Sequence, residues 1–148
     1  GVLSRIAGLF SGRGFNIESL CVAETMDPDV SRMTIVTSGD DRILEQITKQ
    51  LNKVVTVQKG IDFTAKERIE RELALIKIQV TADNRAELMS IVDIFRAKVV
   101  DVSPKSYTIE VTGDSEKIAA AAELLKPFGI KEIVRTGPIV IARSPKAK

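Results

Sequence analysis

The sequence predicts an α+β protein with two similar domains in tandem. Strand-like and helix-like patterns alternate along the chain, and the whole pattern starts again at Leu73. The apolar motif L-x-x-I-A-x-x-F at residues 3–10 also returns as L-x-x-I-V-x-x-F at residues 88–95. The second half has the order strand–helix–strand–strand–helix–strand, which is the ferredoxin-like order βαββαβ. We therefore expect two ferredoxin-like domains, at residues 1–64 and 73–148, joined by a linker at residues 65–72.

The first domain is expected to begin without its opening strand. The strand predicted at residues 73–80 would fall before Gly1 if it were carried back by the distance between the two motifs. The chain opens instead on a helix, whose apolar face is Leu3, Ile6, Ala7 and Phe10. We interpret the missing strand as trimmed, because an unpaired sheet edge is a liability that proteins normally cover.

The remainder of the first domain reads as a hairpin, a helix and a strand. Residues 16–26 and 31–37 flank the turn Asp27-Pro28-Asp29, so they predict two paired strands. Ser38 or Asp40 is placed to cap the next helix, whose predicted apolar face is Ile43, Leu44, Ile47 and Leu51. Residues 54–63 predict a further strand.

The charged run TAKERIERE at residues 64–72 contains no glycine or proline. Glu67 and Arg71 have the four-residue spacing of a helical ion pair, so the run is compatible with a helix as well as with an extended chain. Charge runs are usually solvated, and we therefore interpret it as a solvated linker.

The second domain shows a complete set of element signals. Residues 73–80, 98–102, 106–112 and 130–142 predict strands, the last interrupted at Gly137-Pro138. Two helices lie between them, and we expect Asp83-Asn84 to cap the first and Gly113-Asp114-Ser115 to cap the second. Their predicted buried faces are Leu88, Ile91, Val92 and Phe95 in the first, and Ile118, Ala121, Ala122 and Leu125 in the second.

Composition and charge argue against several functional classes. The formal net charge of +2 is small for a dedicated nucleic-acid-binding protein. The chain has no histidine, the commonest general acid–base residue and transition-metal ligand, which makes catalysis and a metal site less expected, while catalysis by Lys, Asp or Glu stays open. We assign no catalytic residue, no metal and no cofactor to the chain. Cys21 is the single cysteine, which fits a reducing, cytoplasmic setting. No apolar run reaches the roughly 20 residues of a membrane-spanning helix, and we expect no membrane association.

The start of the first helix suggests a ligand site. A glycine at the first position leaves the first backbone N–H groups uncovered by any side chain. These unpaired donors lie at the positive end of the helix dipole, which favours a carboxylate or a phosphate. We therefore expect the helix start to receive a small anionic ligand.

Several separate segments closely resemble the regulatory small subunit of acetohydroxyacid synthase (acetolactate synthase). They are GVLSRIAGLFSGRGFNIES at residues 1–19, SRMTIVT at 31–37, LEQITKQLNKVVTV at 44–57, ERELALIKIQV at 70–80 and IFRAKVVDVSP at 94–104. The segments occur in the order of that family and span nearly the whole chain, so the resemblance is more specific than a shared fold.

The resemblance implies an N-terminal ACT domain, a ferredoxin-like module that binds amino acids, followed by a second ferredoxin-like domain. It also implies a non-catalytic protein that associates with a thiamine-diphosphate-dependent large subunit and raises its activity. Feedback inhibition by valine or a related branched-chain amino acid is expected, with the effector held between two ACT domains of a homodimer.

The resemblance also implies the residues of the effector site. Gly1 would lie at the strand-to-helix turn, where a side chain would block the ligand, although a tight turn alone could explain a glycine. Val2 and Leu3 would donate backbone N–H groups to the effector carboxylate, and water is the alternative partner. The Ser4 hydroxyl would contact the ligand or bond locally to the backbone.

Asn16 and Ile17 would complete the effector site at the start of the next strand. The Asn16 amide offers both a donor and an acceptor, which suits the ammonium and carboxylate of an amino acid. The alternative for Asn16 is a turn residue after Gly14.

Three other functions remain as alternatives. An RNA-binding module on this topology would need aromatic side chains on its strands, and the predicted strands offer little beyond Phe63 and Tyr107. An ACT-type sensor acting on a different enzyme would fit the same residues. A free-standing enzyme would need a nucleophile–base pair or a metal site, and the sequence suggests neither.

Overall fold

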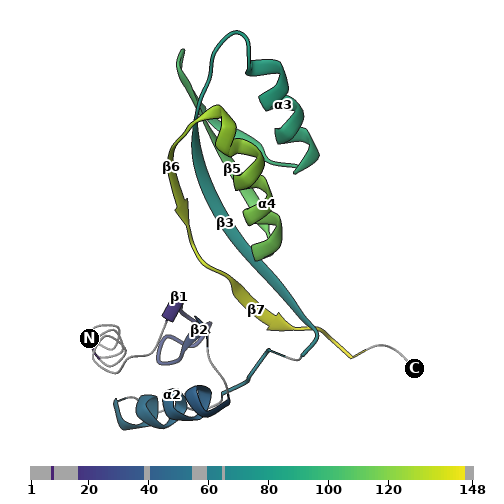
Figure 1. Cartoon of the computed structure of the whole chain (residues 1–148). Coiled ribbons are helices and arrows are strands. Elements are labelled where there is room, and N and C mark those ends of the chain that lie inside the picture. The colour runs from purple at the N-terminus through teal and green to yellow at the C-terminus, as the bar shows by residue number, and fades with distance from the viewer. Residues whose placement is uncertain (1–7, 9–16, 39–40, 55–59, 65, 146–148) are drawn as a thin grey trace. The chain divides into compact units, whose positions relative to one another are not determined.

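The structure is a computed structural model that describes residues 8, 17–38, 41–54, 60–64 and 66–145, without the side chains of residues 41–44 and 54. The chain divides into two compact units, Gly1–Glu67 and Arg68–Lys148. Both units contain strands packed with helices (Figure 1), which confirms the predicted α+β class.

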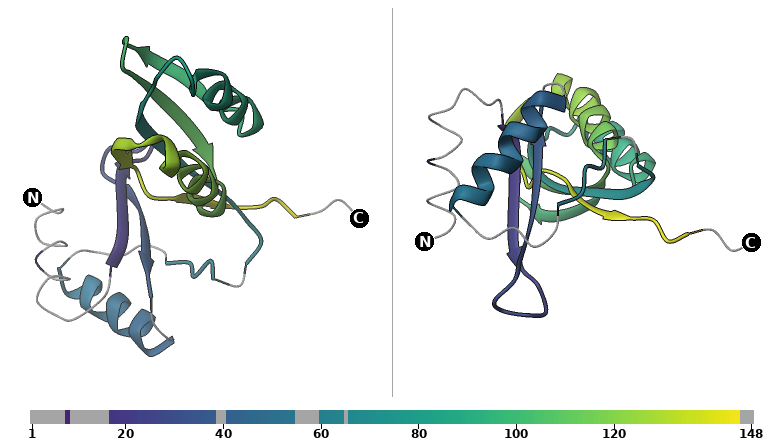
Figure 2. Two further views of the ribbon diagram at one scale, coloured as in Figure 1. Left: turned by 45° about the horizontal axis from the view of Figure 1, so that its top comes forward. Right: turned by 90° about the horizontal axis from the view of Figure 1, so that it is seen from below.

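The first unit contains a β-hairpin and a helix. Strands β1 (Ile17–Glu24) and β2 (Ser31–Thr37) pair antiparallel, with Cys21 opposite Thr34. The turn between them, which projects from the hairpin in the right-hand view of Figure 2, is closed by a hydrogen bond from Thr25 N to Val30 O. Helix α2 (Asp41–Val54) supplies the buried Ile47, against which Ile17, Leu20, Met33, Ile35 and Leu51 pack.

The prediction of a strand at residues 54–63 is wrong in the part that the structure describes. Val54 is the last residue of α2, and residues 60–63 have no strand structure, while residues 55–59 lie outside the described residues. The Asp62 carboxylate accepts hydrogen bonds from Thr64 N (3.0 Å) and Thr64 Oγ1 (2.7 Å), which lowers the Asp62 pKa. Such a local side-chain turn competes with strand pairing, and this explains why the β-branched pattern did not decide the structure here.

The second unit has the predicted ferredoxin-like topology. Its strands are β3 (Arg68–Gln79), β4 (Lys98–Val102), β5 (Ser106–Gly113) and β6 (Ile130–Arg135), paired in the order β4-β5-β3-β6. All of these pairings are antiparallel. A short strand β7 (Ile139–Ala142) follows Gly137-Pro138 and pairs with the first four residues of β3.

The core of the second unit lies between this sheet and its helices, α3 (Arg85–Ile94), α4 (Ser115–Leu125) and the 3-10 turn η1 (Lys126–Phe128) (Figure 1). Alternate residues of β3 face the helices, as the period of two in a strand requires. The buried cluster is Ala74, Ile76, Ile78, Val80, Leu88, Val92, Ile109, Val111, Ile118, Ala121 and Leu125.

Strand β3 begins at Arg68, five residues before the predicted start at Leu73. Residues 68–72, which we expected in a linker, therefore belong to the strand. They are extended because Arg68–Arg71 pair with Ile139–Ala142 of β7. The helical pair between Glu67 and Arg71 does not form, and the Arg71 guanidinium donates instead to the Glu70 carbonyl oxygen at 2.7 Å.

The helix boundaries follow local signals. Asp114 caps α4 as predicted, since its carboxylate accepts a hydrogen bond from Lys117 N at 2.8 Å. Asn84 lies at the N-cap of α3 but does not bond to the helix with its side chain. Its carboxamide oxygen accepts from Thr81 N at 2.8 Å, while Thr81 Oγ1 accepts from Asn84 N at 3.3 Å, so the pair closes the turn before the helix.

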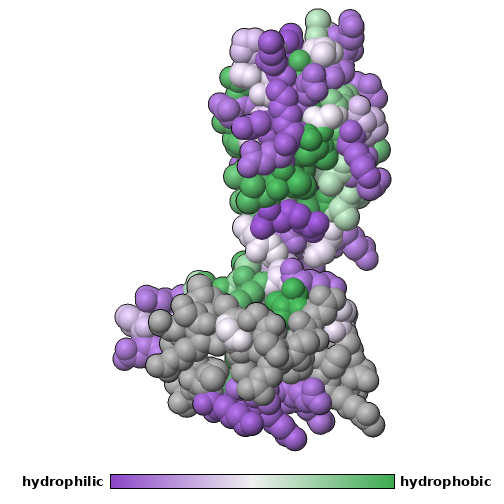
Figure 3. Space-filling model, turned by 60° about the vertical axis from the view of Figure 1, so that its left-hand side comes forward, coloured by the Kyte–Doolittle hydropathy of each residue, from purple (hydrophilic) through white to green (hydrophobic). Residues whose placement is uncertain are grey.

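Apolar side chains also reach the surface of the second unit, where Figure 3 shows them interrupting a hydrophilic face. On the sheet, Leu75 is 39% exposed and pairs with Val134, which is 55% exposed. On the helices, Ile94 is 71% exposed and Leu124 is 49% exposed. Neither of these two helix residues belongs to the buried core, and Leu124 lines a groove that is described below.

Candidate functional site

Most of the predicted effector site lies outside the described residues. This applies to Gly1, Val2, Leu3, Ser4 and Asn16. Ile17 is the one predicted site residue that the structure describes, and it is the first residue of β1.

The side chain of Ile17 belongs to the core of the first unit. It is half-buried, packs with the cluster around Ile47, and lies opposite Thr37 in the hairpin. The Ile17 side chain therefore has a packing role in the described part of the first unit.

Ser19 is a polar residue near Ile17 that the sequence reasoning missed. The hairpin register shifts between Ile17 and Ser19, so Glu18 is an extra residue opposite the Thr37–Val36 step. Such bulges re-aim side chains. The Ser19 hydroxyl is buried and has no hydrogen-bond partner among the described residues. A buried hydroxyl without a partner costs free energy, so Ser19 is a candidate for a ligand contact. The sequence does not show this position, because a register shift leaves no signal in the alternation of a strand.

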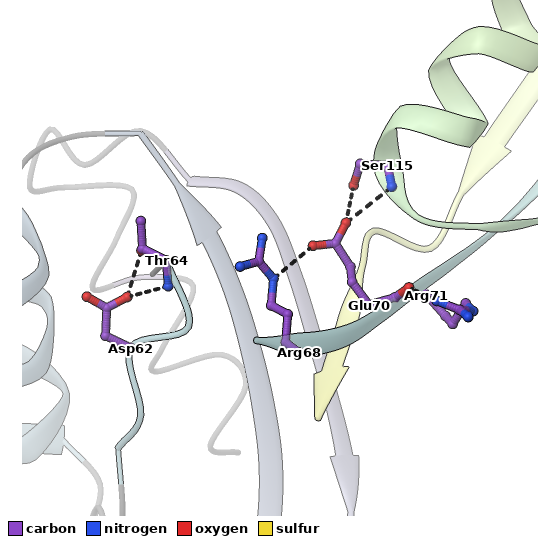
Figure 4. A network of polar contacts seen from close by, with 6 residues as sticks. All are labelled: Asp62, Thr64, Arg68, Glu70, Arg71 and Ser115. Carbon is purple, nitrogen blue, oxygen red and sulfur yellow. Dashed lines mark hydrogen bonds and ion pairs between the residues drawn. The ribbon is translucent and has the colours of Figure 1, made fainter. Parts of the chain in front are cut away.

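A polar network joins the beginning of strand β3 to the start of helix α4 (Figure 4). The Glu70 carboxylate accepts from Ser115 N (3.2 Å), from Ser115 Oγ (2.9 Å) and from Arg68 Nε (3.4 Å). Burial alone would raise the Glu70 pKa, but the hydrogen bonds from Ser115 and Arg68 outweigh it and the pKa is lowered. Glu70 thus satisfies a free N–H at the start of α4, where a negative charge is favourable.

Chemistry-bearing groups are sparse in the described part of the chain. Within it, no three His, Cys, Asp or Glu side chains gather in a way that could hold a metal ion. Cys21 is half-buried in β1. None of the described helices is long and apolar enough to cross a membrane.

The fold and the sequence together define a two-domain ACT protein. Residues 1–59 match the family described as "AHAS small subunit-like ACT domain", and residues 71–144 match "Small subunit of acetolactate synthase". The two matches fall on the two units of the structure.

Similar proteins agree with this class along the whole chain. The chain is 52% identical to the probable acetolactate synthase small subunit of Methanothermobacter thermautotrophicus, over 99% of this chain and 88% of the relative. It is 53% identical to the acetolactate synthase small subunit of Aquifex aeolicus, over 100% of this chain and 78% of the relative. The crystal structure of the small subunit from Thermotoga maritima matches with a TM-score of 0.88 and 42% identity, covering 99% and 91% of the two chains. The chain therefore belongs to the acetolactate synthase small-subunit family.

Proposed function

We propose that this chain is the regulatory subunit of acetolactate synthase in branched-chain amino-acid biosynthesis. It binds the thiamine-diphosphate-dependent catalytic subunit, raises its activity, and makes it sensitive to feedback inhibition by valine. It carries no catalytic residue of its own. The observation that supports this most strongly is the identity of about half of all residues with small subunits over both units of the chain.

The effector site in this proposal lies between the ACT domains of a homodimer. Among the described residues, β1 pairs only with β2, and the proposed dimer contact would use the other edge of β1. The amides of Val2 and Leu3 would hold the valine carboxylate, and Asn16 and Ile17 would contact it from the adjoining strand. Ser19, whose buried hydroxyl has no hydrogen-bond partner in the described part of the chain, is an additional candidate contact.

A ligand held by two protomers favours one arrangement of the pair over others. The free energy by which the ligand shifts the equilibrium between two arrangements cannot exceed its difference in binding free energy for them, typically about 1–3 kcal/mol. That range corresponds to a change of about 5- to 150-fold in an equilibrium, which is sufficient for feedback control.

The experiment is reconstitution with the purified catalytic subunit, measuring acetolactate formation with and without this chain and across a valine titration. The proposal predicts higher activity with the chain and inhibition by valine. If the chain neither binds nor activates the catalytic subunit but does bind an amino acid, it is instead an ACT-type sensor acting on a different enzyme.

The site assignment is tested separately with Gly1→Asp. The added carboxylate would repel the carboxylate of valine, so inhibition should be lost while activation is kept. Gly8→Asp is the matched control, because a Cβ at Gly8 has no atom within 4 Å and Gly8 is exposed. Normal valine sensitivity in Gly1→Asp would refute the site.

A further inference from the structure

A groove lies between the two helices of the second unit. Its volume is about 370 Å³, and it is bounded by α3 from its N-cap to Ile91, by the end of α4 and by η1. The lining residues are Asn84, Glu87, Ile91, Glu123, Leu124, Pro127 and Phe128. The effector site proposed above lies in the first unit, so this groove is a different feature.

Part of the groove is apolar. Ile91 and Phe128 are half-buried there, and Leu124 is 49% exposed. Ile94 follows Ile91 by three residues on the same face of α3 and is 71% exposed, so the apolar surface continues beyond the groove. Exposed apolar surface bordered by polar residues is typical of an interaction site.

The charges of the groove are all negative. Glu87 and Glu123 are its only charged lining residues. Glu87 forms no ion pair with any residue in the described ranges. Glu123 lies 3.9 Å from Lys126, but both side chains are about three-quarters exposed, at 77% and 74%, and such surface pairs contribute little. The carboxylates can therefore accept a cation from outside.

An apolar surface beside two available carboxylates fits a cationic group on an apolar stem. Lysine and arginine have this form, since their methylene groups lie along apolar surface while the charged end remains near water. A second copy of the chain would bind poorly if it used the same groove. In a two-fold symmetric contact, Glu87 and Glu123 of one copy would face the same two carboxylates of the other copy, and like charges repel.

We propose that this groove docks a basic amphipathic segment of the catalytic subunit. The inference depends on the proposed function, which names that subunit as the partner, and adds where on the second unit it binds and by which chemistry. The basic end of the segment contacts Glu87 and Glu123, and its apolar side covers Leu124 and Ile94.

The principal test compares two charge reversals in the full chain, Glu87→Lys/Glu123→Lys and the control Asp93→Lys/Glu116→Lys. Both double variants change the net charge equally, and all four acids are exposed. In the groove pair, Glu87 lies in the first turn of α3 and Glu123 in the last turn of α4. In the control pair, Glu116 lies in the first turn of α4 and Asp93 in the last turn of α3. Asp93 and Glu116 do not line the groove. We expect the groove variant to bind the catalytic subunit about tenfold or more weakly, and the control to stay within about twofold of the unchanged chain.

Two milder variants keep the test decisive if charge reversal harms folding. Glu87→Gln/Glu123→Gln should weaken binding and reduce its dependence on salt concentration, because the attraction to a basic segment is electrostatic. Leu124→Asp should also weaken binding. Valine binding, measured by calorimetry, should be unchanged in each variant because the effector site lies in the first unit.

The outcomes separate this inference from the proposed function. Equal binding by the groove variants and the control, with the unchanged chain binding normally, overturns the docking site alone. A change in oligomeric state of the groove variants, without a change in binding to the catalytic subunit, assigns the groove to a second copy and also overturns it. Failure of the unchanged chain to bind the catalytic subunit overturns both proposals.

Discussion

Arg135 Nε lies 2.5 Å from a carboxylate oxygen of Glu72, and the Glu72 side chain is only 2% exposed. The pair lies where β6 ends and the chain passes on to β7. Next to it, Leu73 N donates to Thr136 Oγ1 at 3.1 Å and Thr136 N donates to Leu73 O at 3.0 Å. Two neighbouring residues of β3 are thus joined to two residues that lie 63 positions away.

Removal of Arg135 should destabilise the second unit. Arg135→Leu leaves the Glu72 carboxylate buried without its partner, and we expect the free energy of unfolding to fall by about 3 kcal/mol. This value is near the low end for a broken buried ion pair, because the Arg135 side chain is 40% exposed. The double variant Glu72→Leu/Arg135→Leu should lose less, since no buried charge remains. Urea unfolding followed by the fluorescence of Tyr107, the only tyrosine in a chain without tryptophan, reports on this unit. A double variant less stable than the single one would contradict this account.

Glu70 should make the stability of the second unit depend on pH. Its folded pKa is lowered, so its contribution is fully present above the ordinary glutamate pKa, about 4.3, and is lost as the pH falls through the folded value. Glu70→Gln should therefore cost about 1–2 kcal/mol at pH 7, and the difference from the unchanged chain should shrink below about pH 4. Urea unfolding at a series of pH values measures it. Glu110→Gln, on the neighbouring strand, is the control, and a difference that stayed constant to low pH would be evidence against this role.

A side chain at Gly129 should destabilise the second unit. Its φ is +94°, and an added Cβ would lie 3.2 Å from the Gln79 carboxamide oxygen, so Gly129→Ala should cost about 1–2 kcal/mol. Gly60→Ala is the control, because a Cβ there has no atom within 4 Å. Thermal unfolding of both variants gives the comparison, and equal melting temperatures would argue against backbone strain at Gly129.

Ser19 should respond to substitution differently with and without effector. Because its buried hydroxyl has no hydrogen-bond partner within the ranges that the structure describes, Ser19→Ala should leave the stability of the effector-free chain unchanged or raise it by up to about 1 kcal/mol. If Ser19 contacts the effector as proposed, the same variant should bind valine more weakly. Thermal unfolding and valine calorimetry measure the two effects, and unaltered valine affinity would exclude the contact.

The sequence alone determined the kinds of most elements and the exact bounds of some. The β2 and β4 strands have the predicted ends, and Asp114 caps α4 as expected, because alternation and capping depend on residues within a few positions of each other. The family was likewise readable from several separate segments. Of the predicted effector residues, the structure describes Ile17 alone, so the site itself stays a prediction.

Tertiary structure decided what depends on residues far apart in the chain. Residues 68–72 look like a solvated charge run, yet they form a strand because residues 68–71 pair with β7 and Glu72 pairs with Gly113 of β5. The buried Glu72 carboxylate is paired with Arg135. The acidic groove likewise exists only because the start of α3 and the end of α4 are brought together. Local propensity determines the conformation of a few residues, but burial and charge pairing depend on neighbours that the folded chain supplies.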